Sequence, residues 1–331
     1  MQLGPLSSLR GRCVVLTGPT GQVGRAVVRR LAGEAEIIAV ARFRDSAARE
    51  QLEAAGVRCV AADLAEADLS ALPEDPDAVL HFAVSKHPQA DFAADLRANA
   101  EGLGRLLSRC RRAKAALVCS SAAVYAYAGG KPVSEDAPLG DNHRSLLPTY
   151  SLSKIAAETV ARFAAREFSV PVVIARLSVP YGDEGGWPWY HLLMMQAGHA
   201  VPVHPERPDT YNLLHEDDLV AHIPLLLAAA SVPASTFNWG GEVVGIETWC
   251  GELGRITGLE PRFEESERAI GALPLDTSRL QALGARIRVP WREGLRRMVA
   301  ARNPELLRGE AAREVSAGAR PRGADCRDDP G

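Results

Sequence analysis

The segment Cys13-Val14-Val15-Leu16-Thr17-Gly18-Pro19-Thr20-Gly21-Gln22-Val23-Gly24 is followed by a helix-forming stretch that runs to about Leu31. A short apolar run, a glycine-rich turn and a helix are typical of the first unit of a doubly wound sheet. Without a Cβ, Gly18 and Gly21 let the backbone turn tightly and approach a pyrophosphate, whose charge the helix N-terminus favours. Gly24 lets the helix pack close to the strand. The segment therefore predicts dinucleotide binding, with a purely structural tight turn as the alternative.

Apolar strands and amphipathic helices then alternate along the chain. Such alternation predicts an α/β fold, a doubly wound parallel sheet (Rossmann) covered by helices on both faces. We expect strands at 36–41, 57–61, 78–82, 115–120 and 172–175, and helices at about 46–55, 92–112 and 148–168. A ligand of such a sheet binds beyond the carboxyl ends of its strands. The residues that fall there are Gly18, Arg42, Asp63, Ala83 and Ser121.

A second lobe is predicted from about Tyr181, where Pro, Gly and aromatic residues cluster. Further strand and helix patterns follow at 211–214, 217–230, 236–239 and 246–257. We expect a dinucleotide-binding domain at 1–180 with returning segments at about 211–241, and an interleaved, smaller α/β substrate lobe at 181–301. Residues 302–331 are charged, rich in Gly and Pro and short of large apolar side chains, so we expect disorder there.

Tyr150 and Lys154 lie four residues apart in the predicted helix at 148–168. Residues at this spacing share one helix face, with Cβ atoms about 5–6 Å apart. An ammonium held near a phenol favours the phenolate and lowers the phenol pKa by roughly 1–3 units from about 10. Tyr150 is therefore a candidate general acid or base, and a hydroxyl such as that of Ser121 can hold a substrate oxygen beside it. An ordinary helix face is the alternative.

A second Tyr-x-x-x-Lys spacing runs from Tyr127 to Lys131 and contains Gly129 and Gly130. Each glycine costs up to about 1 kcal/mol relative to alanine in a helix. We therefore expect a loop at this place, in which the tyrosine and lysine side chains need not face one another.

Composition narrows the class of protein. The chain has 331 residues, 47% hydrophobic and 24% charged, which suits one large α/β domain or two smaller lobes. A net charge of −3 and a pI near 6.3 argue against binding to nucleic acid or a membrane surface. No signal peptide or membrane-spanning run is visible, so we expect a cytoplasmic protein. The scattered cysteines and histidines predict reduced thiols and no metal site.

Several motifs spaced between about residues 12 and 300 together resemble the extended short-chain dehydrogenase/reductase family, of the NAD(P)-dependent epimerase/dehydratase type. They are TGPTGQVG at 17–24, DL at 63–64, VLHFA at 79–83, Asn99 with Gly102, SSAAVY at 120–125, Tyr150 with Lys154, HEDDL at 215–219 and FNWGG at 237–241. The resemblance implies that the cofactor contacts Gly18, Thr20, Gly21, Gln22, Val23, Gly24, Arg42, Asp63, Leu64, Phe82, Ala83, Lys154 and Pro180.

The resemblance also implies a mechanism. Tyr150 would transfer a proton to or from the substrate oxygen while the nicotinamide C4 gives or takes a hydride. Lys154 would lower the pKa of Tyr150 and hold the nicotinamide ribose, and Ser121 would position the substrate oxygen. Asn99 would maintain a water that relays protons. Ordinary helix and turn chemistry is the alternative for Asn99 and Asp63.

The end of the second predicted strand bears on the choice of cofactor. Enzymes selective for NAD usually carry Asp or Glu there, bonded to the ribose diol. Residues 40–44 read VARFR, with no carboxylate before Asp45. Arg42, with Arg25 or Arg44, can instead fork onto a 2′-phosphate. We therefore predict NADP, with NAD as the alternative; a solvated surface charge is the structural alternative for Arg42.

Departures from the family pattern narrow the range of expected reactions and substrates. Sugar-nucleotide dehydratases of the family place an acid pair where this chain has Ala122 and Ala123, so we expect no dehydration. Val179 replaces the Asn of the R-x-x-N-V-Y-G-P motif, and Tyr211 replaces an Arg before the H-V-x-D run, although Arg207 lies nearby. Losing an amide and a cation argues against a sugar-nucleotide substrate. The residues expected to contact the substrate are Val84, Ala122, Ala123, Tyr181, Trp187, Arg207 and Tyr211.

We therefore expect an NAD(P)-dependent oxidoreductase that transfers a hydride to or from the carbonyl or alcohol of a small, mostly uncharged metabolite. A sugar-nucleotide 4-epimerase is the first alternative, and an inactive cofactor-binding regulator is the second. A small-molecule substrate is the expected partner, with no nucleic acid and no membrane. Relatives imply a homodimer packed through the helices predicted at 92–112 and 148–168.

Overall fold

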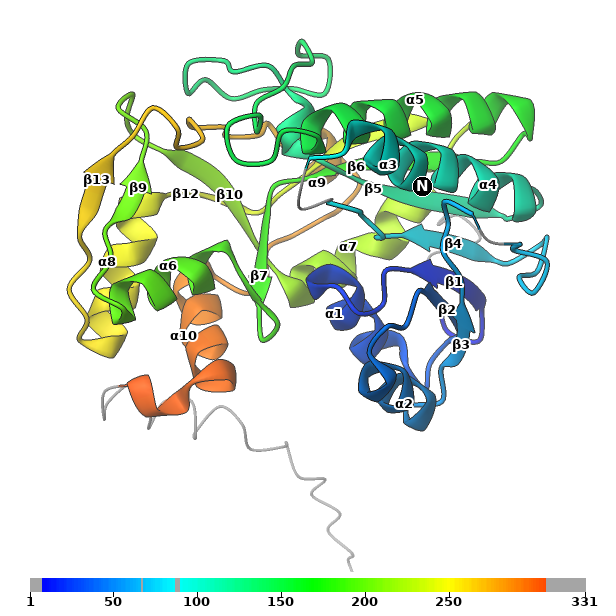
Figure 1. The fold of residues 1–331 in the computed structure, drawn as a ribbon, viewed down its shortest axis with the longest axis horizontal. Coiled ribbons are helices and arrows are strands. Elements are labelled where there is room, and N and C mark those ends of the chain that lie inside the picture. Colours follow the sequence, from blue (N-terminus) through cyan, green and yellow to red (C-terminus); the bar gives the residue numbers. More distant parts are fainter. Residues whose placement is uncertain (1–7, 67, 87–89, 308–331) are drawn as a thin grey trace, which may run out of the picture.

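The protein is described by a computed structural model that covers residues 8–66, 68–86 and 90–307. Its large sheet has the strand order β11-β6-β5-β4-β1-β2-β3, and all neighbouring pairs are parallel (Figure 1). The predicted doubly wound sheet is thus confirmed. Its strands are β1 (Cys13–Thr17), β2 (Glu36–Ala41), β3 (Arg58–Ala61), β4 (Ala78–His81), β5 (Ala115–Ser121), β6 (Val172–Leu177) and β11 (Ser235–Trp239).

Helices cover both faces of this sheet (Figure 1). Alternate side chains of a strand point to opposite faces, so Val14 and Leu16 of β1 enter one core and Val15 enters the other. The first core packs against α1 (Gln22–Leu31), α2 (Ser46–Ala54) and α7 (Glu216–Ala228). The second packs against α4 (Gly102–Arg109) and α5 (Tyr150–Glu167).

Small side chains on one face of α5 bring it close to the sheet. Ala157, Ala161, Ala164 and Ala165 are all buried in the second core. Alanine is the best helix former and occupies little volume, so the same residues favour the helix and its close packing. This packing places the first turns of α5 beside the carboxyl end of β5.

The predicted helix at 92–112 is interrupted. It consists of α3 (Phe92–Leu96), a π-helical turn η1 (Arg97–Glu101) and α4. The amide of Asn99, inside η1, accepts from Ser85 N at 2.6 Å and donates to Ser85 O at 2.9 Å. Single π turns inside helices often mark functional sites. The chain stays helical from Phe92 to Arg109, and a pattern of apolar spacing could not predict the extra residue of the π turn.

The second lobe contains a four-stranded sheet, β12-β10-β7-β8, and a two-stranded one, β13-β9. Its aromatic core includes Tyr181, Tyr211 and Trp249. After it has contributed β10, the chain returns to the large sheet with α7 and β11, so the two lobes are interleaved. The elements of the second lobe are β7 (Val179–Gly182), β8 (Gly185–Gly186), α6 (Trp187–Gln196), β9 (Val201–Val203), β10 (Thr210–His215), β12 (Glu242–Gly245), α8 (Ile246–Thr257), β13 (Phe263–Glu265) and α10 (Trp291–Arg302).

Three short elements complete the fold: η2 (Ala122–Val124), α9 (Ser278–Ala282) and η3 (Pro304–Leu306). The disorder predicted for 302–331 concerns mainly residues 308–331, which lie outside the described residues; η3 follows α10 directly. Within the described ranges, the structure contains no helix with the length and apolar character needed to cross a bilayer.

Candidate active site

The glycine-rich loop meets the end of β4 at very short range. Gly18 has a φ of +72°, and a Cβ built on it would lie 2.7 Å from Ala83 N. A Cβ on Gly24 would lie 2.0 Å from Gly18 O, which explains why α1 can start so close to β1. A Cβ on Gly21 would make an ordinary contact of 3.5 Å with the same oxygen. The loop is therefore a backbone cradle at the N-terminus of α1, as a pyrophosphate site requires.

A cavity of about 920 Å³ begins at this loop and follows the carboxyl ends of the strands. Its size is within the usual range for a site that holds a cofactor or a drug-sized molecule. It lies where the switch in strand order between β1 and β4 predicts a ligand. The sequence-predicted residues that line it are Gly18, Thr20, Gly21, Arg42, Asp63, Leu64, Phe82, Ala83, Val84 and Asn99.

The part of the cavity beyond β2 is cationic. Arg42 and Arg44 line it, and neither makes a hydrogen bond or ion pair with another described residue. The nearest carboxylate in the sequence, Asp45, is committed to capping α2 through the backbone NH groups of Ala47 and Ala48. No free carboxylate therefore follows β2 at the position where a ribose diol is usually bound.

Three residues predicted to contact the cofactor have mainly structural contacts. The Gln22 amide donates to Pro180 O at 3.0 Å and to Gly185 O at 3.3 Å. These bonds join α1 to the second lobe. Val23 packs partly buried against the first core. None of Gln22, Val23 and Pro180 lines the cavity.

Tyr150 and Ser121 meet at the far end of the same sheet edge. Tyr150 is the first residue of α5 and Ser121 is the last residue of β5. The Ser121 side chain lies close enough to the Tyr150 phenol to lower its pKa. The Ser121 hydroxyl oxygen accepts from Ala123 N at 3.2 Å, which fixes its position. A substrate oxygen between these two hydroxyls would have a proton donor and a second hydrogen-bond partner.

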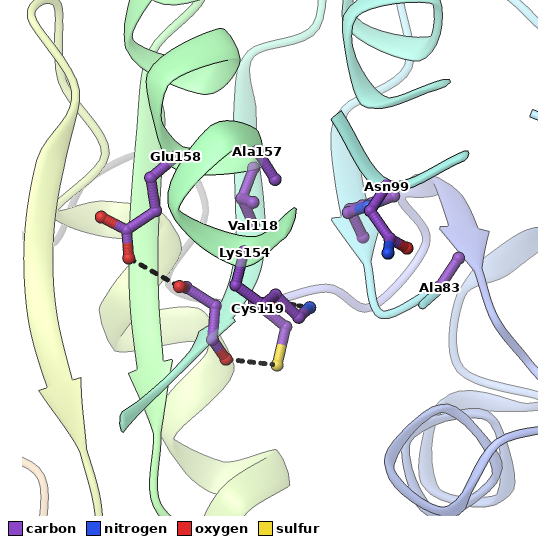
Figure 2. Close-up of a pocket in the computed structure, with 9 residues that line it drawn as sticks. Ala83, Asn99, Val118, Cys119, Lys154, Ala157 and Glu158 are labelled. Atoms are coloured by element: carbon purple, nitrogen blue, oxygen red, sulfur yellow. Dashed lines mark hydrogen bonds between the residues drawn. The ribbon is translucent and has the colours of Figure 1, made fainter. Parts of the chain in front are cut away.

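Lys154 reaches from the next turn of α5 toward β5, as Figure 2 shows. It is buried, and its Nζ donates to Cys119 O at 2.7 Å. Burial lowers the pKa of Lys154, while Cys119 and Glu158 oppose this shift. Burial also raises the pKa of Tyr150, although part of this side chain is solvent-accessible; the Ser121 hydroxyl and the Lys86 ammonium oppose that shift. The net lowering of the phenol pKa that the sequence predicted is therefore not found.

A small space lies beside Lys154 (Figure 2). It is lined by Lys154, Cys119 and His81, and it shares Ala83 and Asn99 with the large cavity. Burial followed by the nearby Lys154 lowers the pKa of His81 to about 3, so this imidazole is neutral at pH 7. The shared residues Ala83 and Asn99 place Lys154 next to the large cavity.

Asn99 acts on this site through the backbone and through Ser153. Besides its two bonds to Ser85, its Nδ2 donates to the Ser153 hydroxyl at 3.1 Å. The amide therefore joins the segment after β4 to α5, between the residues that line the cavity and those that carry Tyr150. The water relay implied by the resemblance stays a prediction.

Glu158 lies one further turn along α5 and holds three elements together. Its carboxylate accepts from the Ser120 hydroxyl at 2.6 Å and from Arg176 at 2.8 and 2.9 Å. Arg176, on β6, also donates to Glu135 O and lies over the Tyr125 ring, 4.8 Å from its centroid. This buried network fixes the end of β5, one residue before Ser121.

Most residues expected to contact the substrate do not line the cavity and belong to the second lobe. Tyr181 and Tyr211 are buried in the second lobe, and their hydroxyls donate to main-chain carbonyls. Trp187 packs against Tyr211, with ring centroids 4.9 Å apart. Arg207 is bound to Glu247 and Glu265 at 2.6 Å each. These four are core or ion-paired residues in the structure, and the hydroxyls of Tyr181 and Tyr211 and the guanidinium of Arg207 already have partners.

The two alanines and Val84 remain close to the reaction centre. Ala122 and Ala123 form η2 directly after Ser121 and are both buried. Val84 is 39% exposed and lines the cavity. The second Tyr-x-x-x-Lys pair is a loop, as expected, and the Tyr127 hydroxyl donates to Glu206 at 2.6 Å rather than facing Lys131.

Sequence reasoning missed three residues of the site. Glu184, after β7, lines the cavity and pairs with Arg25 at 3.4 Å. The Lys86 ammonium lies 5.2 Å from the centroid of the Tyr150 ring, and the His143 ring lies 6.1 Å from it. Only one signal pointed to any of these: Lys86 is one of four lysines in a chain rich in arginine.

Comparisons with known proteins agree with this geometry. The chain is 26% identical over 275 residues to a trifunctional UDP-glucose 4,6-dehydratase/UDP-4-keto-6-deoxy-D-glucose 3,5-epimerase/UDP-4-keto-L-rhamnose-reductase of Arabidopsis thaliana, covering 74% of this chain. It spans only 40% of that protein's length. It is 30% identical over 228 residues to a 2'-dehydrokanamycin reductase of Streptomyces kanamyceticus, covering 65% of this chain and 58% of the relative.

Among solved structures, MoeE5 in complex with UDP-glucose and NAD superposes with a TM-score of 0.74 at 25% identity, covering 89% of this chain and 99% of that one. The sequence profile of the NAD dependent epimerase/dehydratase family matches residues 14–240, which include the glycine loop, Ser121, Tyr150 and Lys154. The chain therefore belongs to the NAD dependent epimerase/dehydratase family.

Proposed function

We propose that the chain is an NAD(P)-dependent oxidoreductase that reduces a carbonyl or oxidises an alcohol, with Tyr150 as the proton donor or acceptor. The observation that carries this proposal is that Ser121, at the end of β5, and Tyr150, at the start of α5, lie together at the same edge of the parallel sheet as the glycine loop and its cavity. The intact pair with Lys154 argues against a regulator that has lost its activity.

The described residues fit a dinucleotide. Gly18 and Gly21 leave the backbone open to a pyrophosphate, and the edge of β4 at Phe82 and Ala83 forms the wall beside it. A bound nicotinamide would supply or accept the hydride. The chain itself supplies the Ser121 hydroxyl, which holds the substrate oxygen, and the Tyr150 hydroxyl, which exchanges a proton with it. Lys154 stabilises the end of β5 through Cys119 O and brings a positive charge close to the site.

The residues beside Ser121 favour simple hydride transfer over dehydration. Elimination of water needs an acid and a base beside the reacting carbon, and Ala122 and Ala123 offer neither. Arg207 is bound to two carboxylates and Tyr211 is buried, so neither is free to hold a diphosphate. These features support a small, mostly uncharged metabolite as the substrate.

NADP is the cofactor that the end of β2 favours. Arg42 and Arg44 are exposed cations at the cavity, and Asp45 is used as a helix cap. Guanidinium groups bind phosphate in a bidentate fashion. We expect Arg42→Ser to raise the KM for NADPH about tenfold and to leave the KM for NADH unchanged. A wild-type preference for NADH would contradict this assignment; MoeE5 itself was solved with NAD.

A sugar-nucleotide 4-epimerase is the second candidate. The same Ser121–Tyr150–Lys154 set can oxidise an alcohol and reduce the resulting carbonyl from the other face, and the family name includes this activity. An epimerase would keep its nicotinamide bound and show no net turnover of it.

One screen separates the two candidates. The purified protein is incubated with NADPH and a panel of ketones and aldehydes, and in parallel with UDP-glucose or dTDP-glucose without added cofactor. We expect oxidation of NADPH by a carbonyl compound, lost in Tyr150→Phe, and no new sugar nucleotide. Epimer formation without added cofactor would overturn the first choice.

We also propose that the chain forms a homodimer through the outer surface of α3 and α5. Phe92 and Leu96 on α3, and Leu152 and Phe163 on α5, are between 37% and 59% exposed. Large apolar side chains grouped on neighbouring helices often mark an interface. Light scattering of the wild type and of Phe163→Glu tests this, with a dimer expected only for the wild type. The cytoplasmic location stays a prediction.

A further inference from the structure

Lys86 occupies an unexpected place in the site. It lies in the segment after β4, its side chain is exposed, and its ammonium lies 5.2 Å from the centroid of the Tyr150 ring. No ion pair joins it to a carboxylate of the described chain. A cation near an aromatic ring is attracted to the ring face, and its charge also acts on the phenol oxygen. Lys86 thus brings a positive charge to the Tyr150 ring from an exposed position.

Lys154, by contrast, is buried and directed at the backbone of β5. Its Nζ is bound to Cys119 O at 2.7 Å, and burial lowers its pKa, which weakens its hold on the proton. An ammonium that is desolvated and directed at a backbone carbonyl is a less dependable source of positive charge than an exposed one.

The other groups around Tyr150 add no competing charge at its ring. The His143 ring lies 6.1 Å away; burial followed by Lys86 lowers the His143 pKa to about 4, so it is neutral at pH 7. On β5, Ser121 lowers the pKa of Tyr150, and Cys119 opposes this only as a thiolate, whose formation burial disfavours by raising the pKa of that thiol. Asp95 of α3 is buried beneath the start of α5, where it accepts from the Thr149 hydroxyl at 2.6 Å.

We propose that Lys86 is a second cation of the active site, which stabilises the phenolate form of Tyr150 from its exposed position beside the ring. Lys86 acts through Tyr150, so it is a positioning residue rather than a catalytic one. This inference rests on the proposed role of Tyr150. It divides between two lysines a task that the family resemblance gives to Lys154 alone.

The direct test is a titration that needs neither substrate nor turnover. Phenolate formation is followed by ultraviolet difference spectroscopy, and the Tyr150 component is obtained by subtracting the curve of Tyr150→Phe. We expect Lys86→Met to move the midpoint of this component up by about 1 pH unit, because an opposite charge at this range is worth roughly 1–3 units. Lys86→Arg keeps the charge and should keep the midpoint.

Lys131→Met is the matched control. Lys131 is also exposed and unpaired with any described carboxylate, and it is the lysine of the other Tyr-x-x-x-Lys spacing. Its removal changes the net charge by the same amount and should leave the Tyr150 midpoint in place. An equal shift in both variants, or no shift in Lys86→Met, overturns the proposal and leaves the function proposed for the chain untouched.

A second readout applies to the holoenzyme at moderate pH. The kcat/KM for alcohol oxidation rises as Tyr150 loses its proton, so Lys86→Met should move this profile to higher pH and Lys86→Arg should restore it. NADPH affinity is measured in parallel and should stay unchanged. Weaker NADPH binding with an unmoved pH profile would show that Lys86 serves the cofactor, and it would overturn the proposal.

Discussion

A tyrosine lies at the edge of the large sheet and another lies in the core of the second lobe, and their surroundings differ. Tyr211 in the second lobe is buried, and its hydroxyl donates to Gly271 O at 3.0 Å. Burial raises the pKa of Tyr211, and the nearby Asp209 raises it further. Burial raises the pKa of Tyr150 too, but there a hydroxyl and a cation oppose the shift. Burial alone therefore does not distinguish the two phenols, and the groups beside them do.

Removing the two hydroxyls should give the largest contrast between these regions. We expect Tyr150→Phe to lower kcat about 10²- to 10⁴-fold, the usual contribution of a general acid or base, and to leave the Kd for NADPH unchanged. Tyr211→Phe should leave kcat within about a factor of two and cost about 1 kcal/mol of unfolding free energy, the net value of a hydrogen bond. Steady-state kinetics and urea denaturation measure both. Equal losses of kcat in the two variants would abolish the distinction.

The sequence predicted the sheet edge far better than the second lobe. Strands β1 and β2 match their predicted bounds, because apolar runs ending in Gly18 or Arg42 are simple local signals. Tyr181, Tyr211 and Arg207 could not be placed, since a spacing along the chain does not tell whether a hydroxyl or a guanidinium will meet a carbonyl or a carboxylate from a distant segment.

The same limit explains what was missed near Tyr150. Lys86 approaches from a segment 64 positions earlier in the sequence, and no local pattern connects the two. The π turn at Asn99 depends on a bond to Ser85 that the helical spacing cannot reveal. Only the three-dimensional arrangement shows that these residues belong to one site.

Substitution of Glu158 tests whether a buried ion pair at the sheet edge contributes more to the unfolding free energy than a partly exposed pair in the second lobe. Glu158→Gln leaves the Arg176 guanidinium buried without its carboxylate, and we expect a loss of about 3–5 kcal/mol of unfolding free energy. Glu252→Gln is the control, because its partner Arg255 is 62% exposed, and should cost less than about 1 kcal/mol. Urea denaturation compares them. Similar small losses would mean that the Glu158 network is not a structural support of the site.

Gly18→Ala tests whether the glycine loop binds the cofactor or only forms a turn. The new Cβ would meet Ala83 N at 2.7 Å, and its positive φ adds strain of about 1–2 kcal/mol. We expect NADPH binding to weaken about tenfold or more. Gly33→Ala has the same strain, with a φ of +80°, but no atom within 4 Å of the new Cβ. Fluorescence titration with NADPH should show unchanged affinity for Gly33→Ala; a matching loss there would assign the effect to strain alone.

Buried neutral histidines should make both regions sensitive to acid. Burial is the main cause that lowers the pKa of both histidines. The pKa is about 3 for His81, in the large sheet, and about 4 for His191, in the second lobe. The unfolded chain binds these protons first, so stability present above pH 6.5 is lost as pH falls toward 4, by about 1.4 kcal/mol per pH unit for each histidine.

His191→Gln should remove the contribution of the second lobe to this slope, while an amide can still accept the bond from Trp249 Nε1. His199, which is exposed, provides the control variant His199→Gln. Urea denaturation at several pH values between 7 and 4 measures the slopes. An unchanged slope in His191→Gln would place the acid sensitivity of the protein elsewhere.

A crystal structure of the protein with bound NADP tests the central claim most directly. We predict a pyrophosphate on the glycine loop at Gly18 and Gly21, a 2′-phosphate beside Arg42, and a nicotinamide ring next to the hydroxyls of Ser121 and Tyr150. A dinucleotide bound outside this cavity, or a nicotinamide ring out of reach of Tyr150, would contradict the account.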